Sequence, residues 1–168
     1  MEWHREVISD ALERALDALR QRSILAPFYL ARGTGLALHF GHRRSLDLDF
    51  FGGEPFDSQR LLGELPPGSE LSVTEKAPET LHVNVHGTRV SFLGYGYPVL
   101  FPFEEFLGVR VADPRDIACM KISAISGRGA RRDFVDLYAA CGRYGLEPLL
   151  ALFRQKYARV IKLPESKC

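Results

Sequence analysis

The chain has 168 residues, of which 46% are hydrophobic and 26% are charged, a composition that supports a buried core and excludes a disordered protein. Its 22 Lys and Arg residues nearly balance 21 Asp and Glu residues, and the formal net charge of +1 argues against a protein that coats duplex DNA through a basic excess. No apolar stretch is long enough to cross a bilayer, and the three cysteines form no close pair, so we expect a cytoplasmic protein with reduced thiols and no membrane partner.

The first third of the chain shows clear periodicity. Hydrophobic residues recur at helical spacing over 5–22, which predicts an amphipathic helix. The apolar run 28–31 predicts a short buried strand, 32–35 a tight turn, and 36–40 a short helix. The strict alternation over 46–51 predicts a strand whose Leu46, Leu48 and Phe50 enter the core.

The rest of the chain divides into strands followed by helices. A helix with Ser58 as N-cap is expected over 58–65, and three helices are expected after Asp113 and Pro114, the first of them interrupted by glycines at 127 and 129. Further strands are expected over 71–75, 81–86, 88–93 and 109–111. This order predicts an α+β fold, with a small mixed sheet flanked by helices and a C-terminal helical layer. We expect one domain over 1–168, with an α/β core at about 24–112 and packed helices at about 113–163.

Asp47 and Asp49 lie two residues apart on the strand predicted for 46–51, so both carboxylates face the same side. Facing carboxylates repel each other unless a cation lies between them, and Mg²⁺ (or Mn²⁺) takes oxygen ligands while leaving positions open for phosphates. An isolated Asp-x-Asp is more often a solvated strand face. Here a glycine-containing turn and a helix N-terminus precede the acids, and Gly33 and Thr34 suit a bound phosphate. The order of these features favours a phosphate and metal site with both aspartates as metal ligands.

Two segments resemble the AbiEii/AbiGii toxin family of the DNA polymerase β-like nucleotidyltransferase superfamily. In the segment F-Y-L-A-R-G-T-G-L-A-L-H-F-G-H-R-R-S-L-D-L-D-F-F (28–51), the matching residues are Gly33, Thr34, Leu36, His42, Arg43, Ser45, Asp47 and Asp49. In the second segment (116–137), they are Asp116, Lys121, Ala124, Arg128, Arg132, Asp133, Asp136 and Leu137. The resemblance implies a nucleotidyltransferase-type sheet and metal-dependent transfer of a nucleoside monophosphate from a nucleoside triphosphate to an acceptor hydroxyl of RNA or protein. It also implies a cognate antitoxin as partner.

The resemblance further implies a role for each matching polar residue. Asp47, Asp49 and Lys121 are expected to be catalytic, with the two aspartates holding the metal. Nucleotide binding is expected from Gly33, Thr34, Arg43, Ser45 and Arg132, with support from Arg128, Asp133 and Asp136. From the residues alone, an internal salt-bridge network that ties two helices together remains an alternative for Lys121, Asp133 and Asp136.

Two positions depart from the family pattern. Arg32 replaces the first glycine of a Gly-Gly pair, so either its backbone is strained at positive φ or its guanidinium adds a phosphate contact. Ser91 stands where a third carboxylate is expected on a later strand, and a serine hydroxyl is a poor metal ligand and a poor base. These departures keep two alternatives open: a protein of this fold that binds nucleotide or RNA without transfer, and a structural subunit of a toxin–antitoxin pair.

Three further features receive plainer interpretations. Glu75 and Asp116 are the two acids that we consider as replacements for the third carboxylate. His82 and His86 are expected on a polar sheet face, too far apart to share one metal ion. The basic residues of the last helix are expected to be solvated or to guide RNA: Arg154, Lys156, Arg159 and Lys162.

Overall fold

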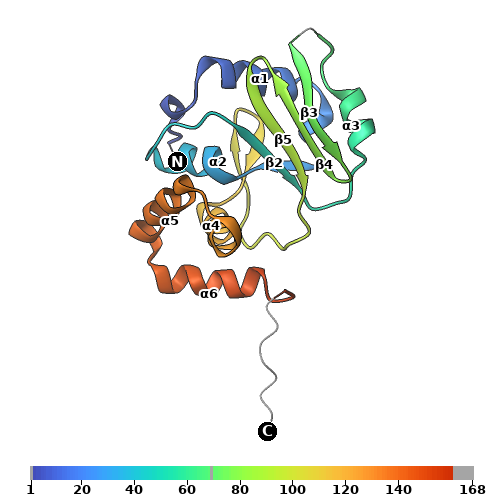
Figure 1. Ribbon diagram of the computed structural model, residues 1–168. Coiled ribbons are helices and arrows are strands. Elements are labelled where there is room, and N and C mark those ends of the chain that lie inside the picture. The colour runs from blue at the N-terminus through green and yellow to red at the C-terminus, as the bar shows by residue number, and fades with distance from the viewer. Residues whose placement is uncertain (1, 69, 161–168) are drawn as a thin grey trace.

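A mixed β-sheet forms the centre of the structure, a computed structural model that describes residues 2–68 and 70–160 (Figure 1). Within these ranges the sheet has seven strands in the order β3-β4-β5-β2-β1-β7-β6. The strands are β1 (Phe28–Leu30), β2 (Leu48–Gly52), β3 (Leu71–Ala77), β4 (Thr80–Val85), β5 (Thr88–Gly94), β6 (Glu104–Phe106) and β7 (Val109–Val111). The α-helices are α1 (Asp10–Arg20), α2 (Arg32–Phe40), α3 (Ser58–Glu64), α4 (Pro114–Arg128), α5 (Arg131–Tyr144) and α6 (Leu146–Lys156). The α+β class and the mixed sheet are confirmed.

One face of the sheet packs against α1. Strand alternation directs Leu48 and Phe50 of β2 to this face, where the rings of Phe50 and Phe92 stack at a centroid distance of 5.5 Å. The Ser9 side chain accepts a hydrogen bond from Leu12 N at 3.1 Å and caps α1. Residues 5–7 therefore form a separate 3₁₀ turn, and the helix predicted over 5–22 is shorter than its periodicity indicates.

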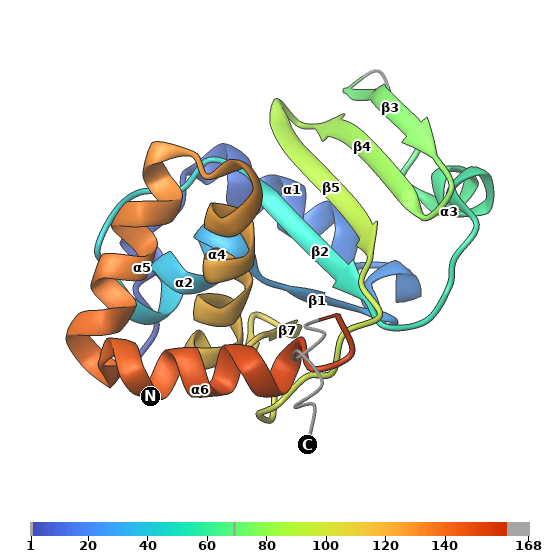
Figure 2. The same cartoon turned by 60° about the horizontal axis from the view of Figure 1, so that its bottom comes forward.

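The opposite face of the sheet packs against the C-terminal helices. Tyr29 and Phe51 join a second core cluster with residues of α2, α4 and α6. Helices α4 and α5 pack against α2, and α6 packs against α4 and α5 (Figure 1 and Figure 2). The predicted C-terminal helical layer is therefore present. Asp49 of β2 alternates with Leu48 and Phe50, so its side chain lies on this second face.

A buried ion pair anchors α6. Lys156 Nζ lies 2.8 Å from Asp116 Oδ1 and 2.8 Å from the carbonyl oxygen of Pro98, and both charged side chains are at most 2% exposed. Asp116 also accepts hydrogen bonds from Leu100 N and Phe101 N at 3.0 Å. The expectation that Lys156 is solvated is wrong, because its charge is neutralised inside the protein. Asp116 is occupied here and does not reach the other acids as a third carboxylate.

Several boundaries differ from the sequence expectations for local reasons. α2 begins at Arg32, so residues 32–35 form its first turn and not a separate tight turn. β2 begins only at Leu48, which leaves Leu46 73% exposed in the preceding loop and corrects its predicted place in the core. Asp57, not Ser58, caps α3, and α4 continues through the glycine at 127. In the part of the chain that the structure describes, no helix has the length and apolar character needed to span a membrane.

Candidate functional site

A cleft of about 490 Å³ lies on the sheet face that carries Asp49. The strands form one side of it, and the first turns of α2 and α5 together with one side of α4 form the other. It brings together side chains that are far apart in the sequence. Nine of the predicted site residues line it: Gly33, Arg43, Ser45, Asp47, Asp49, Lys121, Arg128, Arg132 and Asp133. Thr34 and Asp136 are buried outside its lining.

Hydrogen bonds to their backbone carbonyl oxygens hold the two aspartates beside the first turn of α2. Ala31 N donates to the carbonyl oxygen of Asp49 at 3.1 Å, and the Thr34 hydroxyl donates to the carbonyl oxygen of Asp47. The side chains of Asp47 and Asp49 are 31% and 17% exposed, so both are accessible from the cleft. The sequence prediction of two acids next to a helix tip therefore describes the geometry of this site.

The two carboxylates are only partly neutralised by the protein. Arg32 Nη1 lies 3.8 Å from Asp49 Oδ1, and Arg132 Nη1 lies 3.8 Å from Asp47 Oδ2, both beyond hydrogen-bonding distance. Burial raises the pKa of Asp49; Arg32 opposes this rise and the neighbouring Asp47 carboxylate adds to it. A cation bound between the acids would relieve both the burial cost and the repulsion.

The donor chemistry fits a hard divalent cation. Two partly exposed carboxylates offer oxygen ligands of the kind that Mg²⁺ and Mn²⁺ prefer, and a triphosphate or water can supply the remaining ligands. Among the described residues, no cluster of three or more His, Cys, Asp or Glu side chains has metal-binding geometry. The arrangement therefore suits a metal that arrives with its substrate better than a metal held by the protein alone.

The rest of the cleft is strongly basic. Seven of its lining residues are Arg or Lys and three are Asp, although the whole chain carries a formal charge of only +1. The basic residues are Arg32, Arg43, Arg44, Arg89, Lys121, Arg128 and Arg132. Such a concentration of positive charge favours a polyanionic ligand such as a triphosphate.

Lys121 and Arg43 are held in the wall of the cleft by the buried Asp136, and Lys121 also by the partly exposed Asp133. Lys121 Nζ lies 2.8 Å from Asp133 Oδ1 and 2.8 Å from Asp136 Oδ2. Asp136 is fully buried and also accepts hydrogen bonds from Arg43 Nε at 2.7 Å and from His42 Nε2 at 2.7 Å. Burial alone would raise the pKa of Asp136, but these donors outweigh it and hold the pKa far below its usual value. The internal salt-bridge network that the sequence allowed as an alternative is present. It joins α4 and α5 and also includes the loop that follows α2.

Gly33 and Thr34 serve this framework directly. A Cβ atom on Gly33 would lie 2.2 Å from Arg43 Nη2, so a larger residue there would displace the guanidinium from its present position. The Thr34 hydroxyl bonds Ser45 Oγ at 2.6 Å besides the carbonyl oxygen of Asp47. Thr34 is 1% exposed and holds the loop before β2, which corrects its predicted contact with phosphate. Ser45 lines the cleft with its hydroxyl already bonded to Thr34.

The backbone of Arg32 is strained as the first interpretation predicts, and the contact of its guanidinium with phosphate stays a prediction. Its φ is +54°, a left-handed conformation that costs a residue with a Cβ about 1–2 kcal/mol. Its guanidinium lines the cleft, lies 5.3 Å from the centroid of the Phe51 ring and faces Asp49. The strain therefore accompanies a positive charge placed beside a candidate metal ligand.

Ser91 lies directly beside Asp49 and is bonded to a histidine. The parallel register of β2 and β5 pairs Asp49 with Ser91, and the Ser91 hydroxyl lies 2.7 Å from His82 Nδ1 on β4. Both Ser91 and His82 line the cleft. Sequence reasoning assigned His82 only to a polar sheet face. The tight turn at 86–87 is the sequence feature from which this contact can be predicted, because the turn sets the hairpin register that places residue 82 opposite residue 91.

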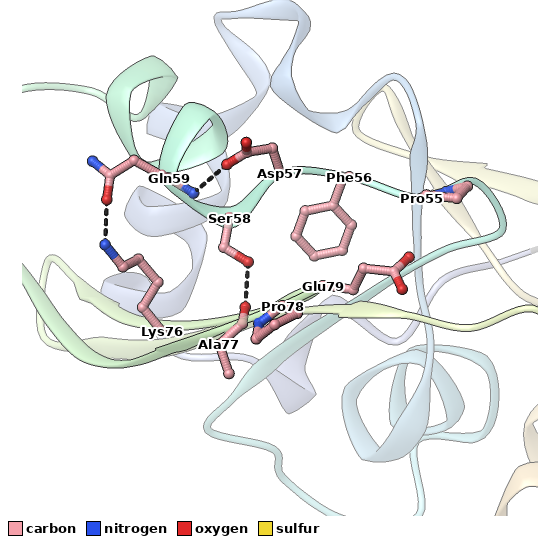
Figure 3. A pocket seen from close by; sticks show the side chains of 9 residues that line it. All are labelled: Pro55, Phe56, Asp57, Ser58, Gln59, Lys76, Ala77, Pro78 and Glu79. Carbon is pink, nitrogen blue, oxygen red and sulfur yellow. Dashed lines mark hydrogen bonds between the residues drawn. The ribbon is translucent and has the colours of Figure 1, made fainter.

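A second hollow, of about 670 Å³, lies where α3 meets the ends of β3 and β4 (Figure 3). Four of its polar side chains are bonded within the fold: Asp57 accepts from backbone N–H groups of α3, Ser58 Oγ donates to the carbonyl oxygen of Ala77 at 2.5 Å, and Lys76 donates to Gln59. Because these groups already have partners within the fold, we place the candidate site in the basic cleft.

Known proteins are similar to this chain in sequence. The family model described as "Nucleotidyl transferase AbiEii toxin, Type IV TA system" matches residues 90–166, which contain the segment 116–137. The uncharacterized protein aq_aa25 of Aquifex aeolicus (strain VF5) is 37% identical over 152 residues, which cover 87% of this chain and 74% of that protein.

Solved structures share the fold at low sequence identity. A solution structure of the antibiotic-resistance factor ANT(2'')-Ia has a TM-score of 0.59 and 17% identity, and the match covers 95% of this chain and 96% of that one. A crystal structure of ANT(2'')-Ia in complex with adenylyl-2''-tobramycin has a TM-score of 0.58 and 18% identity, over 88% of this chain and 95% of that one. The sheet and helices therefore form a nucleotidyltransferase fold.

Proposed function

The chain belongs to the family of AbiEii nucleotidyl transferases, and on this premise we propose that it transfers a nucleoside monophosphate from a nucleoside triphosphate to an acceptor hydroxyl of RNA. The observation that carries the proposal is the pair Asp47 and Asp49 beside the first turn of α2, inside a cleft whose other charges are mostly positive. An adenylylated ligand is bound by ANT(2'')-Ia, which has the same fold. A protein hydroxyl is the other acceptor class, and the experiment below separates the two.

Each part of the cleft has a task in this reaction. Asp47 and Asp49 would hold Mg²⁺ or Mn²⁺, which when bound stabilises negative charge on the transferring phosphoryl group. Arg32 and Arg132 flank the acids and neutralise triphosphate oxygens. Lys121 presents a fixed ammonium, because Asp133 and Asp136 hold it in place, and this arrangement costs no reorganisation during the reaction.

The family implies two further features of the biology. We propose a cognate antitoxin as the partner that restrains the activity, and a cytoplasmic location, where nucleoside triphosphates are available and Cys119 and Cys141 remain free thiols. Removal of the antitoxin from cells that express the active chain is expected to stop growth, whereas removal of it from cells that express Asp49→Asn is not.

A second candidate function is nucleotide binding without transfer. It is favoured by one observation, the serine that stands beside Asp49 in place of a third carboxylate. A third candidate, a structural subunit of a toxin–antitoxin pair, requires that the two aspartates be dispensable.

A labelling experiment distinguishes these functions. The protein is incubated with Mg²⁺, α-labelled nucleoside triphosphates and either total RNA or total protein, and the Asp49→Asn variant is run in parallel. Asp17→Asn is the matched control, because Asp17 lies on α1, on the other side of the sheet, and pairs with Arg20. Label on RNA with the wild type and with Asp17→Asn, lost with Asp49→Asn, supports transfer to RNA. Binding without label supports the second candidate, and labelling that is indifferent to Asp49→Asn contradicts the proposed site.

A further inference from the structure

The side chains that stand beside Asp49 form a continuous row across four strands. Asp49 on β2 is the register partner of Ser91 on β5, Ser91 is the partner of His82 on β4, and His82 is the partner of Glu75 on β3. Register partners in a sheet point to the same face, so the row extends outward from the candidate metal ligand. Asp49, Ser91 and His82 line the cleft, and Glu75 lies beyond them. A hydroxyl, an imidazole and a carboxylate therefore follow one another in order.

From this row we propose that Ser91 and His82 together accept the proton of the acceptor hydroxyl, at the position where a third carboxylate is otherwise expected. The proposal rests on the proposed function of the cleft and names the groups that activate its acceptor. Ser91 would contact the acceptor, and His82 would act through Ser91.

The contacts of Ser91 and His82 fit these two roles. Ser91 is 2% exposed and its Oγ lies 2.7 Å from His82 Nδ1, a normal hydrogen bond. The His82 side chain is 15% exposed, and its Nε2 lies 3.9 Å from Glu75 Oε2. A carboxylate on that side favours the tautomer with hydrogen on Nε2, which leaves Nδ1 as the acceptor for the serine proton. Ser91 Oγ then keeps a lone pair for a hydrogen bond from the acceptor.

The charged groups around the imidazole are of both signs. Glu75 of β3 is the nearest acid, and Arg89 of β5 and Asp49 of β2 line the same face. Across the cleft, α4 contributes Lys121 and Arg128. An imidazolium formed during the reaction would be stabilised mainly by Glu75, because that carboxylate is the closest opposite charge.

The proton and electron balance of the step is complete without a further reactant. The acceptor oxygen forms a bond to the α-phosphorus, the bond from that phosphorus to the bridging oxygen breaks, and pyrophosphate leaves with the electron pair. The acceptor proton passes to Ser91 Oγ while the original Ser91 proton passes to His82 Nδ1. The imidazolium then releases its proton to water. A serine alone is far too weak a base for this task near neutral pH, and the imidazole supplies the missing basicity.

The test uses the full chain, Mg²⁺, an α-labelled nucleoside triphosphate and total RNA, with single-turnover labelling rates measured from pH 5 to 9. His82→Gln is expected to lower the rate by at least about 100-fold, the lower end of what a general base contributes, and to abolish the rise of rate with pH that a histidine base produces. Binding of the Mg²⁺–triphosphate complex, measured by calorimetry, is expected to change less than about twofold, because His82 contacts neither aspartate. His86→Gln is the matched control, since His86 pairs with Glu70 outside this cleft, and it is expected to behave as the wild type.

Two more variants keep the result independent of folding. Ser91→Ala removes the relay while leaving the imidazole, and is expected to lose a similar factor in rate. Ser91→Asp in the His82→Gln background returns a carboxylate to the position beside Asp49, and is expected to recover at least tenfold in rate, with the onset of activity moved to lower pH because a carboxylate is a stronger acid than an imidazolium. A purely structural role for His82 predicts no such rescue.

The outcomes separate this proposal from the proposed function. Labelling by the wild type that His82→Gln and Ser91→Ala leave unchanged overturns the proton relay while nucleotide transfer stands. Absence of labelling by the wild type, with triphosphate binding intact, overturns nucleotide transfer itself and the relay with it. Loss of the rate in both variants, followed by rescue with Ser91→Asp, supports both.

Discussion

Asp136 is the residue on which the framework of the cleft depends most, and Asp136→Asn tests that dependence. The fully buried carboxylate binds Arg43, His42 and Lys121 through contacts of 2.7–2.9 Å. Asparagine preserves its volume but leaves the two cations without their shared negative charge. Breaking a buried ion pair from one side costs about 3–5 kcal/mol. For a chain of this length, with an unfolding entropy of about 2.1 cal/mol/K per residue, this corresponds to a fall in Tm of about 8–15 °C.

Denaturant unfolding at several pH values measures this effect and its electrostatic origin. The lowered pKa of Asp136 means that the folded state binds its proton less readily than the unfolded state, so this stabilisation is present above about pH 4 and is lost as the pH falls further. Asp136→Asn is therefore expected to lose stability at pH 7 and to lose less than the wild type on acidification. Asp133→Asn is the control. Asp133 is partly exposed and bonds Lys121 and Ala130 N, so this substitution is expected to lower the free energy of unfolding by only about 1 kcal/mol. A loss below 1 kcal/mol for Asp136→Asn, or an unchanged acid dependence, would refute the reasoning.

Three other substitutions test local features of the structure by the same unfolding measurement. Gly33→Ala is expected to cost about 1–3 kcal/mol, because its Cβ would displace the Arg43 guanidinium, and to cost nothing in an Arg43→Ala background; an equal cost in both backgrounds would show that the close contact is irrelevant. Arg32→Gly is expected to be about 1 kcal/mol more stable than Arg32→Ala, since both lose the guanidinium but only alanine keeps the strain at φ +54°; the reverse order would show that the backbone is unstrained. Lys156→Met is expected to cost about 3–5 kcal/mol of stability, because it leaves the buried Asp116 without its cation. Arg154→Met, on the exposed side of α6, should change stability by less than about 0.5 kcal/mol. Similar values for the two substitutions would argue against the buried pair.

Patterns that depend on neighbouring residues were readable from the sequence. The alternation through Leu48, Asp49 and Phe50 predicted correctly which side chains enter the core and which face the cleft, because one strand pairing buries a whole face. The cap at Asp113 with Pro114 likewise placed the start of α4. Leu46 was misplaced because alternation alone does not show where the backbone leaves the sheet.

Features that depend on distant partners were not readable in the same way. The burial of Lys156 depends on Asp116, and the task of the Thr34 hydroxyl depends on the path of residues 45–47, which no local motif specifies. The contact of His82 with Ser91 depends on strand register, which places His82 opposite Ser91 and one strand further from Asp49. The two acids themselves were found because their spacing and their position after a glycine-containing helix start are sequence properties.

The most direct test of the central claim is a calorimetric titration of the full chain with a non-hydrolysable nucleoside triphosphate, in the presence of Mg²⁺ and in its absence. Asp47 and Asp49 beside the first turn of α2 predict binding that requires Mg²⁺, that is retained by Asp17→Asn, and that Asp49→Asn weakens at least about tenfold, a loss of 1.4 kcal/mol. No binding heat with the wild type, or equal affinity for the wild type and Asp49→Asn, would contradict the account.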